Sequence, residues 1–118
     1  MILLDDFVNC VKPDMVTYEN EKVTVLIFSE IYLYVNHSKS DFLFYYSICE
    51  IKSHEYIEMQ SRLSPFILNG FVVNFFFANG AGNVFFRAPS DFYLLTDIHQ
   101  KILTVLKQYT GYKSNEFL

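Results

Sequence analysis

Residues 23–35 read VTVLIFSEIYLYV, two apolar runs interrupted only by Ser29 and Glu30. Apolar side chains recur at every second position, which is the period of a strand with one face turned to a core. The expected faces are Val23, Val25 and Ile27 in the first run and Ile31, Leu33 and Val35 in the second. Ser29 and Glu30 fit a tight turn between the two runs. This stretch therefore predicts a hairpin of two antiparallel strands, and the period-two pattern reaches back to Met15.

Three further segments continue the strand pattern. A polar loop at residues 36–41 precedes a strand over residues 42–46. We also expect residues 48–59 to form a strand, because Ile51 stands between Glu50 and Lys52; the later part of this segment fits a helix or a strand. Residues 66–77 indicate a strand pair or one long bent strand, with Asn69 and Gly70 as the turn or bulge. The residues NGAGN at 79–83 then form a turn into the next apolar run, which makes a second hairpin.

Helices are expected near the two ends of the chain. A short N-terminal helix before Pro13 is indicated by apolar residues at three- and four-residue spacing, namely Leu3, Leu4, Phe7, Val8 and Val11. A longer helix is expected after Pro89, with Ser90 as its N-cap, an end near Tyr109 and a stop at Gly111. Its apolar face consists of Leu95, Ile98, Ile102, Val105 or Leu106, and Tyr109.

The composition predicts one compact α+β domain, mainly antiparallel β, over residues 1–118 with a core of about 15–110. The chain has 118 residues, of which 52% are apolar and 19% aromatic, so it can bury a full core. Strand alternation places about half of the thirteen Phe and nine Tyr on each face of a sheet. The rings outside the main core need another cover: a helix, the N-terminal segment, curvature of the sheet, or an oligomeric interface.

The charge argues against nucleic acid as a partner. The formal net charge is −4, and phosphate binding requires clustered Lys and Arg. Residues 1–60 carry ten acidic and four basic side chains, whereas residues 61–118 carry three acidic and five basic ones. A weakly basic patch on the second half remains an alternative to ordinary solvated charge.

The sequence offers no arrangement that predicts catalysis, and we expect no catalytic, cofactor-binding or metal-binding residue. His37, His54 and His99 are interpreted as surface histidines, and Cys10 and Cys49 as two core thiols. Gly80 and Gly82 fit a hairpin turn better than a dinucleotide-binding loop, because Phe85 stands where that loop needs a third glycine. The acidic pair Asp5-Asp6 suits the first turn of a helix.

The ends and the apolar runs suggest a cytoplasmic or nuclear protein. The first residues carry no basic segment typical of a signal peptide, and position 2 is not the glycine that myristoylation requires. No apolar run reaches the ~18 residues that a membrane-spanning helix needs. We therefore expect a cytoplasmic location.

The order of elements resembles the pleckstrin-homology-like superfamily, and within it the GRAM-type branch. The similar segments are residues 23–34 as a first hairpin, 44–51 as the next strand and turn, 71–77 and 84–87 as later strands, and the helix from Asp91. The resemblance implies a partly open barrel of about seven strands in two nearly orthogonal sheets, with the C-terminal helix closing one end. It also implies a scaffold that binds phosphoinositides, peptides or proteins, usually without catalysis.

One departure from that family affects the expected ligand. Members that bind phosphoinositides carry several Lys and Arg around the first hairpin, whereas here Lys22 and Lys39 stand among acidic residues, namely Glu19, Glu21, Glu30 and Asp41. An anionic headgroup would meet repulsion there. We therefore expect a non-catalytic binding module or complex subunit with a protein partner, in which a second copy of the chain is one alternative.

Two other functions stay open at this point: a peripheral membrane module that binds anionic lipid headgroups, and a small enzyme or ligand-binding barrel. For the favoured function, the candidate interaction surface combines aromatic residues of the later strands with basic residues of the less acidic half. It consists of Phe75, Phe77, Phe85, Arg62 and Arg87.

Overall fold

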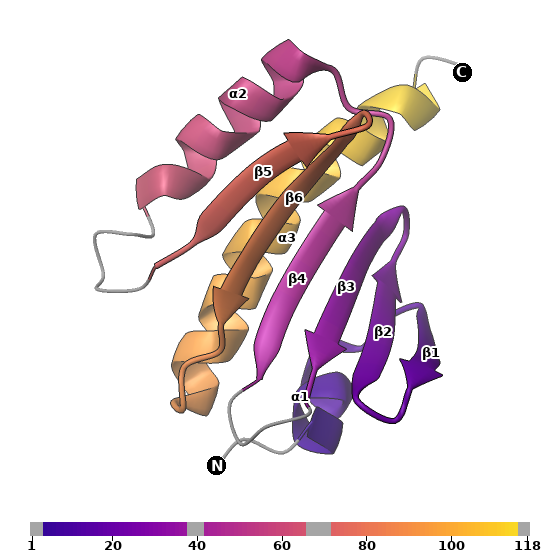
Figure 1. Ribbon diagram of the computed structural model, residues 1–118, viewed down its shortest axis with the longest axis vertical. Helices are drawn as coiled ribbons and strands as arrows, with labels where there is room; N and C mark the ends of the chain where they lie inside the picture. The colour runs from indigo at the N-terminus through magenta and orange to yellow at the C-terminus, as the bar shows by residue number, and fades with distance from the viewer. Residues whose placement is uncertain (1–3, 38–41, 66–71, 116–118) are drawn as a thin grey trace.

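The computed structural model describes residues 4–37, 42–65 and 72–115, with side chains described as far as Thr110. These residues form a six-stranded antiparallel sheet and three helices (Figure 1). In chain order, the elements are α1 (Leu4–Val11), β1 (Met15–Asn20), β2 (Val23–Phe28), β3 (Ile31–Asn36), β4 (Leu43–Ile48), α2 (Ser53–Leu63), β5 (Asn74–Ala78), β6 (Ala81–Arg87) and α3 (Phe92–Asn115).

The strand order is β1-β2-β3-β4-β6-β5, so the last hairpin joins the sheet through β6 beside β4. Both predicted hairpins are confirmed. The β2–β3 pair closes at Phe28 and Ile31, around the expected turn. The β5–β6 pair turns at Asn79 and Gly80, whose φ angles are 54° and 74°. A type I′ turn requires positive φ at both positions, and Asn-Gly is the sequence that adopts it most readily.

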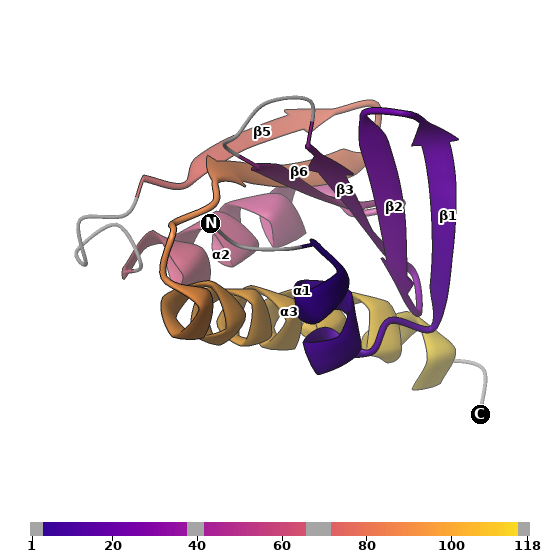
Figure 2. The same ribbon diagram turned by 90° about the horizontal axis from the view of Figure 1, so that it is seen from below.

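All three helices lie on one face of the sheet (Figure 2). α3 runs beneath the middle strands, α1 contacts α3, and α2 contacts both α3 and β5. In Figure 2, β1 and β2 bend toward the helices, so the sheet curls around α1. The curl leaves the sheet open, because no described residue pairs β1 with β5. The chain is therefore an α+β fold built on a curved, open antiparallel sheet.

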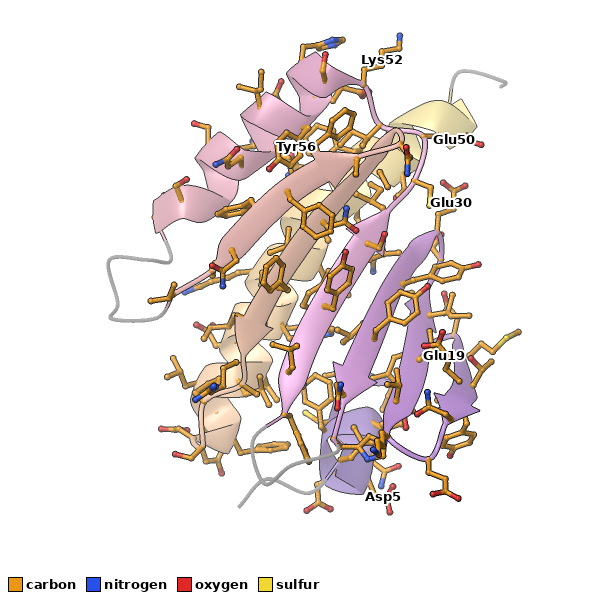
Figure 3. The ribbon with its side chains drawn as sticks, viewed as in Figure 1. Asp5, Glu19, Glu30, Glu50, Lys52 and Tyr56 are labelled. Atoms are coloured by element: carbon orange, nitrogen blue, oxygen red, sulfur yellow. The ribbon has the colours of Figure 1, made fainter. Side chains whose placement is uncertain are left out.

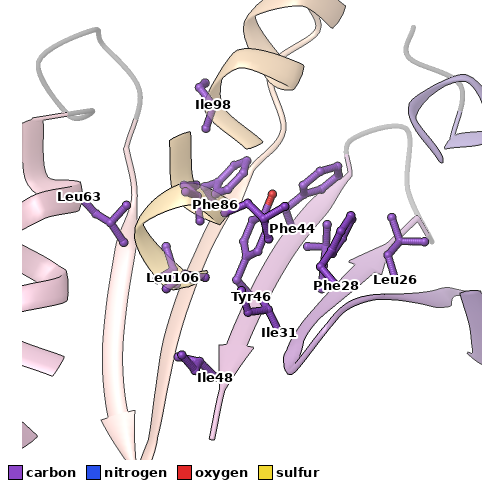
Figure 4. Close-up of a cluster of buried hydrophobic side chains, with 14 of the residues drawn as sticks. Leu26, Phe28, Ile31, Phe44, Tyr46, Ile48, Leu63, Phe86, Ile98 and Leu106 are labelled. Atoms are coloured by element: carbon purple, nitrogen blue, oxygen red, sulfur yellow. The ribbon is translucent and has the colours of Figure 1, made fainter. Parts of the chain in front are cut away.

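The core fills the space between the helices and the sheet (Figure 4). Leu26 and Phe28 of β2 point into it, as do alternate residues of β3, β4 and β6. The predicted apolar face of β2, Val23, Val25 and Ile27, lies on the other side of the sheet, where Val25 and Ile27 pair with Tyr34 and Tyr32. The predicted apolar face of the C-terminal helix is confirmed, since its members are buried: Leu95, Ile98, Ile102, Leu106 and Tyr109. α1 contributes Phe7, which is fully buried against Phe44 at 5.0 Å between ring centroids.

The prediction of a strand over residues 48–59 was wrong, because Ser53–Leu63 is the helix α2. Tyr56, Met59 and Leu63 follow one another at three- and four-residue spacing, and Met59 and Leu63 are fully buried. Ile57, which a strand would have placed opposite Tyr56, is 66% exposed. The helical period therefore prevails over the short alternation around Ile51 that suggested a strand.

Other boundaries also differ from the expectation. α3 continues past Gly111 to Asn115, although a glycine near a helix end commonly stops it. The expected turn or bulge at Asn69 and Gly70 falls outside the described residues, which contain six strands against about seven predicted. Within the described chain, no helix combines the length and the apolar character needed to cross a membrane.

Candidate functional site

The face of the sheet that points away from the helices carries a row of aromatic side chains (Figure 3). They alternate along the strands with the residues that fill the core, so they must point to the opposite side. Strand register brings them together: Tyr34 pairs with Tyr45, and Tyr45 pairs with Phe85. We call this side the open face, and its five rings the aromatic row: Tyr32, Tyr34, Tyr45, Phe85 and Phe76.

The rings of the aromatic row contact one another across four strands. The centroids of Tyr32 and Tyr34 are 6.5 Å apart, and those of Tyr34 and Tyr45 are 6.1 Å apart in an edge-on arrangement. Tyr45 stacks on Phe85 at 5.7 Å, and both lie within 6.0 Å of Phe76. Separations of this size are typical of attractive ring pairs. The row therefore forms one continuous apolar surface on β3, β4, β6 and β5.

The aromatic row is neither buried nor fully hydrated. Tyr32 is 43% exposed and Phe76 39% exposed, and neighbouring Leu43 is 41% exposed. The other rings of the row are half-buried by their neighbours. Burial raises the pKa of the Tyr34 and Tyr45 hydroxyls, and the Glu19 carboxylate raises that of Tyr34 further. Both hydroxyls are therefore protonated at neutral pH and can donate hydrogen bonds to a partner.

One end of the open face is hollowed and acidic. A depression of about 450 Å³ lies there, lined by Ser29, Glu30, Tyr32, Tyr34, Ser47, Cys49 and Glu50. We call it the acidic depression. Glu30 belongs to the β2–β3 turn and Glu50 follows β4, and Figure 3 shows both at the same end of the sheet. Both side chains are exposed, and they line the depression together with the rings of Tyr32 and Tyr34.

The five residues predicted from sequence do not form one surface. Phe75 and Phe77 lie on the helix-covered face, half-buried against the core, and Phe77 contacts Tyr56 of α2 at 5.2 Å between ring centroids. Arg62 lies on α2, where it donates a hydrogen bond to Gln108 of α3. Phe85 and Arg87 alone share the open face, since both alternate with the buried Phe86.

The sequence interpretation missed the tyrosines of the aromatic row. Tyr32 and Tyr34 alternate with the core residues Ile31, Leu33 and Val35, so the strand period already placed them on the opposite face. What the sequence could not show is that no described helix covers this face.

The prediction that His99 lies on the surface was wrong. His99 is fully buried among the rings of Phe7, Phe28 and Tyr46, and its Nδ1 lies 2.5 Å from the Tyr46 hydroxyl. Its other nitrogen, Nε2, has no hydrogen-bond partner. Burial, together with the charge of Lys107, lowers the pKa of His99 to about 4. A neutral imidazole enclosed in this way belongs to the core.

The remaining candidates for chemistry are dispersed. Cys10 and Cys49 are exposed free thiols, so their assignment to the core was wrong. His37 contacts the Thr24 hydroxyl at 3.0 Å, and His54 is exposed at the start of α2. Over the described residues, no three His, Cys, Asp or Glu side chains are grouped in a way that could hold a metal ion. The open face is thus the feature that distinguishes this fold chemically.

Comparison with known proteins returns no similarity: no protein-family model matches the chain, and neither a curated protein nor a solved structure matches it significantly.

Proposed function

We propose that the protein is a non-catalytic binding module or complex subunit that holds a protein partner on its open face. The observation that carries this proposal is the aromatic row, five contacting rings on the side of the sheet away from the helices. An antiparallel sheet with one covered face normally presents polar residues on the other. A contiguous apolar patch on such a face is typical of an interaction surface.

The chemistry of the row fits a protein partner. Tyr and Phe are enriched at the centres of protein interfaces, because a rigid ring contributes much contact area for little loss of conformational freedom. The hydroxyls of Tyr32, Tyr34 and Tyr45 add directional hydrogen bonds at the edge of the rings. Lipid headgroups fit less well, since anionic lipids would meet the exposed carboxylate of Glu30 beside the rings.

A pleckstrin-homology-like relationship is part of this proposal. Support comes from the run of antiparallel strands β1 to β4, the curl of the sheet, and the long helix at the C-terminal end. The presence of α2 between β4 and β5 departs from the order of elements in that family. The proposed binding function does not depend on the relationship, because it rests on the open face itself.

The test is site-specific photo-crosslinking in cells of the source organism. A photoreactive residue at position 45, in the centre of the aromatic row, should yield one dominant cross-linked protein. The matched control is position 93, because Tyr93 is an aromatic residue that is 84% exposed on α3, away from the row. The partner identified at position 45 is then purified, and its affinity for the protein is measured by calorimetry.

Removing the rings should weaken that complex. Tyr45→Ser with Phe85→Ser is expected to raise the dissociation constant by a factor of ten or more, on the order of what central interface aromatics contribute. Tyr93→Ser should leave it unchanged. Equal cross-linking at positions 45 and 93, or unchanged affinity of the double variant, would contradict the proposal. A cross-linked product of twice the chain mass would identify the partner as a second copy.

A further inference from the structure

The two edges of the sheet differ in what lies beside them. β5, at one edge, contacts α2. β1, at the other edge, packs on β2 and makes no comparable contact with any other described element. Figures 1 and 2 both show β1 at the margin of the molecule. One side of the β1 backbone therefore presents N–H and C=O groups that pair with no described strand.

β1 carries few of the features that normally protect an edge strand. Such edges are commonly guarded by proline, by charged side chains, by a bulge or by a covering helix. The sequence of β1 is MVTYEN, without Pro or Lys, and five of its six side chains are exposed. Its single charge, Glu19, lies at a shift of register between Tyr18 and Asn20. Residues 15–18 therefore form a regular edge that can accept a further strand.

The side chain of Tyr18 shows where such a strand is missing. Val16 pairs with the buried Leu26 and Tyr18 with the buried Thr24, so both point to the helix-covered side of the sheet. Tyr18 is nevertheless 77% exposed, because no described strand lies beyond it. A ring in this position can be covered by a side chain from a neighbouring strand across the edge.

The order of side chains along β1 is complementary to itself. A two-fold axis through Thr17 brings two β1 strands together antiparallel, with Thr17 opposite its own copy. In this register, Val16 of each copy lies opposite Tyr18 of the other, and Met15 lies opposite Glu19. Aromatic–β-branched pairs and threonine pairs are among the cross-strand pairs that stabilise a sheet. No like charges lie opposite each other, because Glu19 is the only charged residue of the strand.

We propose that the protein forms a homodimer in which the β1 strands of two copies pair antiparallel about Thr17 and join the two sheets into one. The contact is isologous and uses the β1 edge of both copies, so assembly stops at the dimer. Residues 15–19 of each copy form a small interface, so we expect a weak dimer that dissociates on dilution. The inference goes beyond the proposed function, because this contact leaves the aromatic row uncovered.

The test is charge complementation at position 17, measured by sedimentation velocity over a series of protein concentrations. The unmodified protein should shift from monomer to dimer as its concentration rises. Thr17 is exposed, so Thr17→Lys and Thr17→Glu should both fold, which urea denaturation verifies. Each variant alone places like charges at the axis and should raise the dissociation constant about tenfold or more. An equal mixture of the two should recover dimerisation, since opposite charges then meet.

The matched control is Thr104, an exposed threonine on α3. Thr104→Lys and Thr104→Glu change the net charge by the same amounts as the variants at position 17, and both should dimerise like the unmodified protein. Tyr18→Ser should weaken the dimer several-fold, because each dimer then loses both of its pairs between a tyrosine ring and Val16.

The outcomes separate the edge contact from binding on the open face. A monomer at every concentration would overturn the homodimer, and so would a mixture of Thr17→Lys and Thr17→Glu that stays monomeric. A dimer that persists in Thr17→Lys but is lost in Tyr45→Ser/Phe85→Ser would overturn the edge contact and support a second copy as the partner on the open face. A dimer that depends on position 17 and survives in Tyr45→Ser/Phe85→Ser supports the proposal.

Discussion

At the scale of single residues, the most unusual group is the buried pair of His99 and Tyr46. One imidazole nitrogen contacts the tyrosine hydroxyl and the other lacks a partner. An unsatisfied polar atom in a core costs free energy, and a charged imidazole there would cost more. The pair therefore makes the stability of the fold sensitive to acid.

The free energy of unfolding should fall as pH decreases from about 6.5 to 4. The pKa of His99 is about 4 in the folded chain and near 6.5 when unfolded, so the unfolded state binds the extra proton in this range. The stabilising effect is complete above the unfolded pKa and is lost as pH falls toward the folded one. Its full size is on the order of 3 kcal/mol. Urea denaturation at a series of pH values measures it.

The matched variants for this prediction are His99→Phe/Tyr46→Phe and His54→Gln. The first replaces both buried partners by apolar rings, so its stability should depend much less on pH over this interval. The second removes an exposed histidine and should keep the original slope. If the unmodified protein and the double variant lost stability in parallel, His99 would not be the group responsible.

The position of His99 could in part be derived from the sequence. Residues 95, 98, 99, 102 and 106 follow the spacing of one helical face, so the period places position 99 with the buried residues. Its polarity led instead to a surface assignment, because histidine is buried less often than aliphatic residues. The deciding factor is tertiary: Tyr46, on a strand far away in sequence, provides the hydrogen-bond partner.

At the scale of elements, the residue that caps the start of α3 is not the one that the sequence predicted. Ser90 and Asp91 are both residues that cap helices, and Ser90 was predicted. In the structure, the Asp91 carboxylate accepts hydrogen bonds from the backbone N–H groups of Tyr93 and Leu94, at 2.9 and 3.1 Å. Asp91 therefore satisfies two of the unpaired donors at the beginning of the helix.

Replacing Asp91 should destabilise the protein, whereas replacing its neighbour should not. We expect Asp91→Ala to lower the free energy of unfolding by about 1 kcal/mol, the usual contribution of an N-cap side chain. Ser90→Ala should change it by less than about 0.5 kcal/mol, as for an ordinary surface position. Thermal or urea denaturation of the two variants distinguishes the caps, and the reverse order would assign the cap to Ser90.

The failure to predict α2 also has a cause at this scale. The helix packs where β6 has a glycine: a Cβ at Gly82 would lie 3.2 Å from the methyl carbon of Met59 and 3.4 Å from the ring of Tyr56. The missing side chain allows α2 to approach the sheet closely. Nothing within residues 53–63 indicates this distant space, so the local pattern remained ambiguous between helix and strand.

At the scale of the whole molecule, the two sides of the sheet differ in what covers them, since all three helices lie on one side. The two hairpins, α1 and the apolar face of α3 follow from period and turn chemistry, which are local properties of the sequence. The local sequence does not determine which face of the sheet stays uncovered, because that depends on where the helices pack. For the same reason, Phe75 and Phe77 were grouped with Phe85, although they lie on the opposite side of the sheet.

Substitutions at two adjacent phenylalanines, one on each side of the sheet, should change the free energy of unfolding by different amounts. Phe86 is fully buried in the core, whereas Phe85 belongs to the aromatic row. Phe86→Ala should lower the free energy of unfolding by about 3–5 kcal/mol, since it leaves a cavity. Phe85→Ala should cost about 1 kcal/mol, because it removes ring contacts on a partly hydrated surface. Urea denaturation tests the pair, and similar losses would show that the open face is part of the folding core.

The position of α3 has a consequence for synthesis on the ribosome. Every strand, from β1 to β6, is translated before the helix that covers the inner side of the sheet. Until α3 has left the exit tunnel, the nascent strands have apolar groups on both sides and lack the helix that packs beneath the middle strands. Exposed apolar surface of this kind promotes aggregation, so chains that end before α3 should be less soluble than chains that contain it.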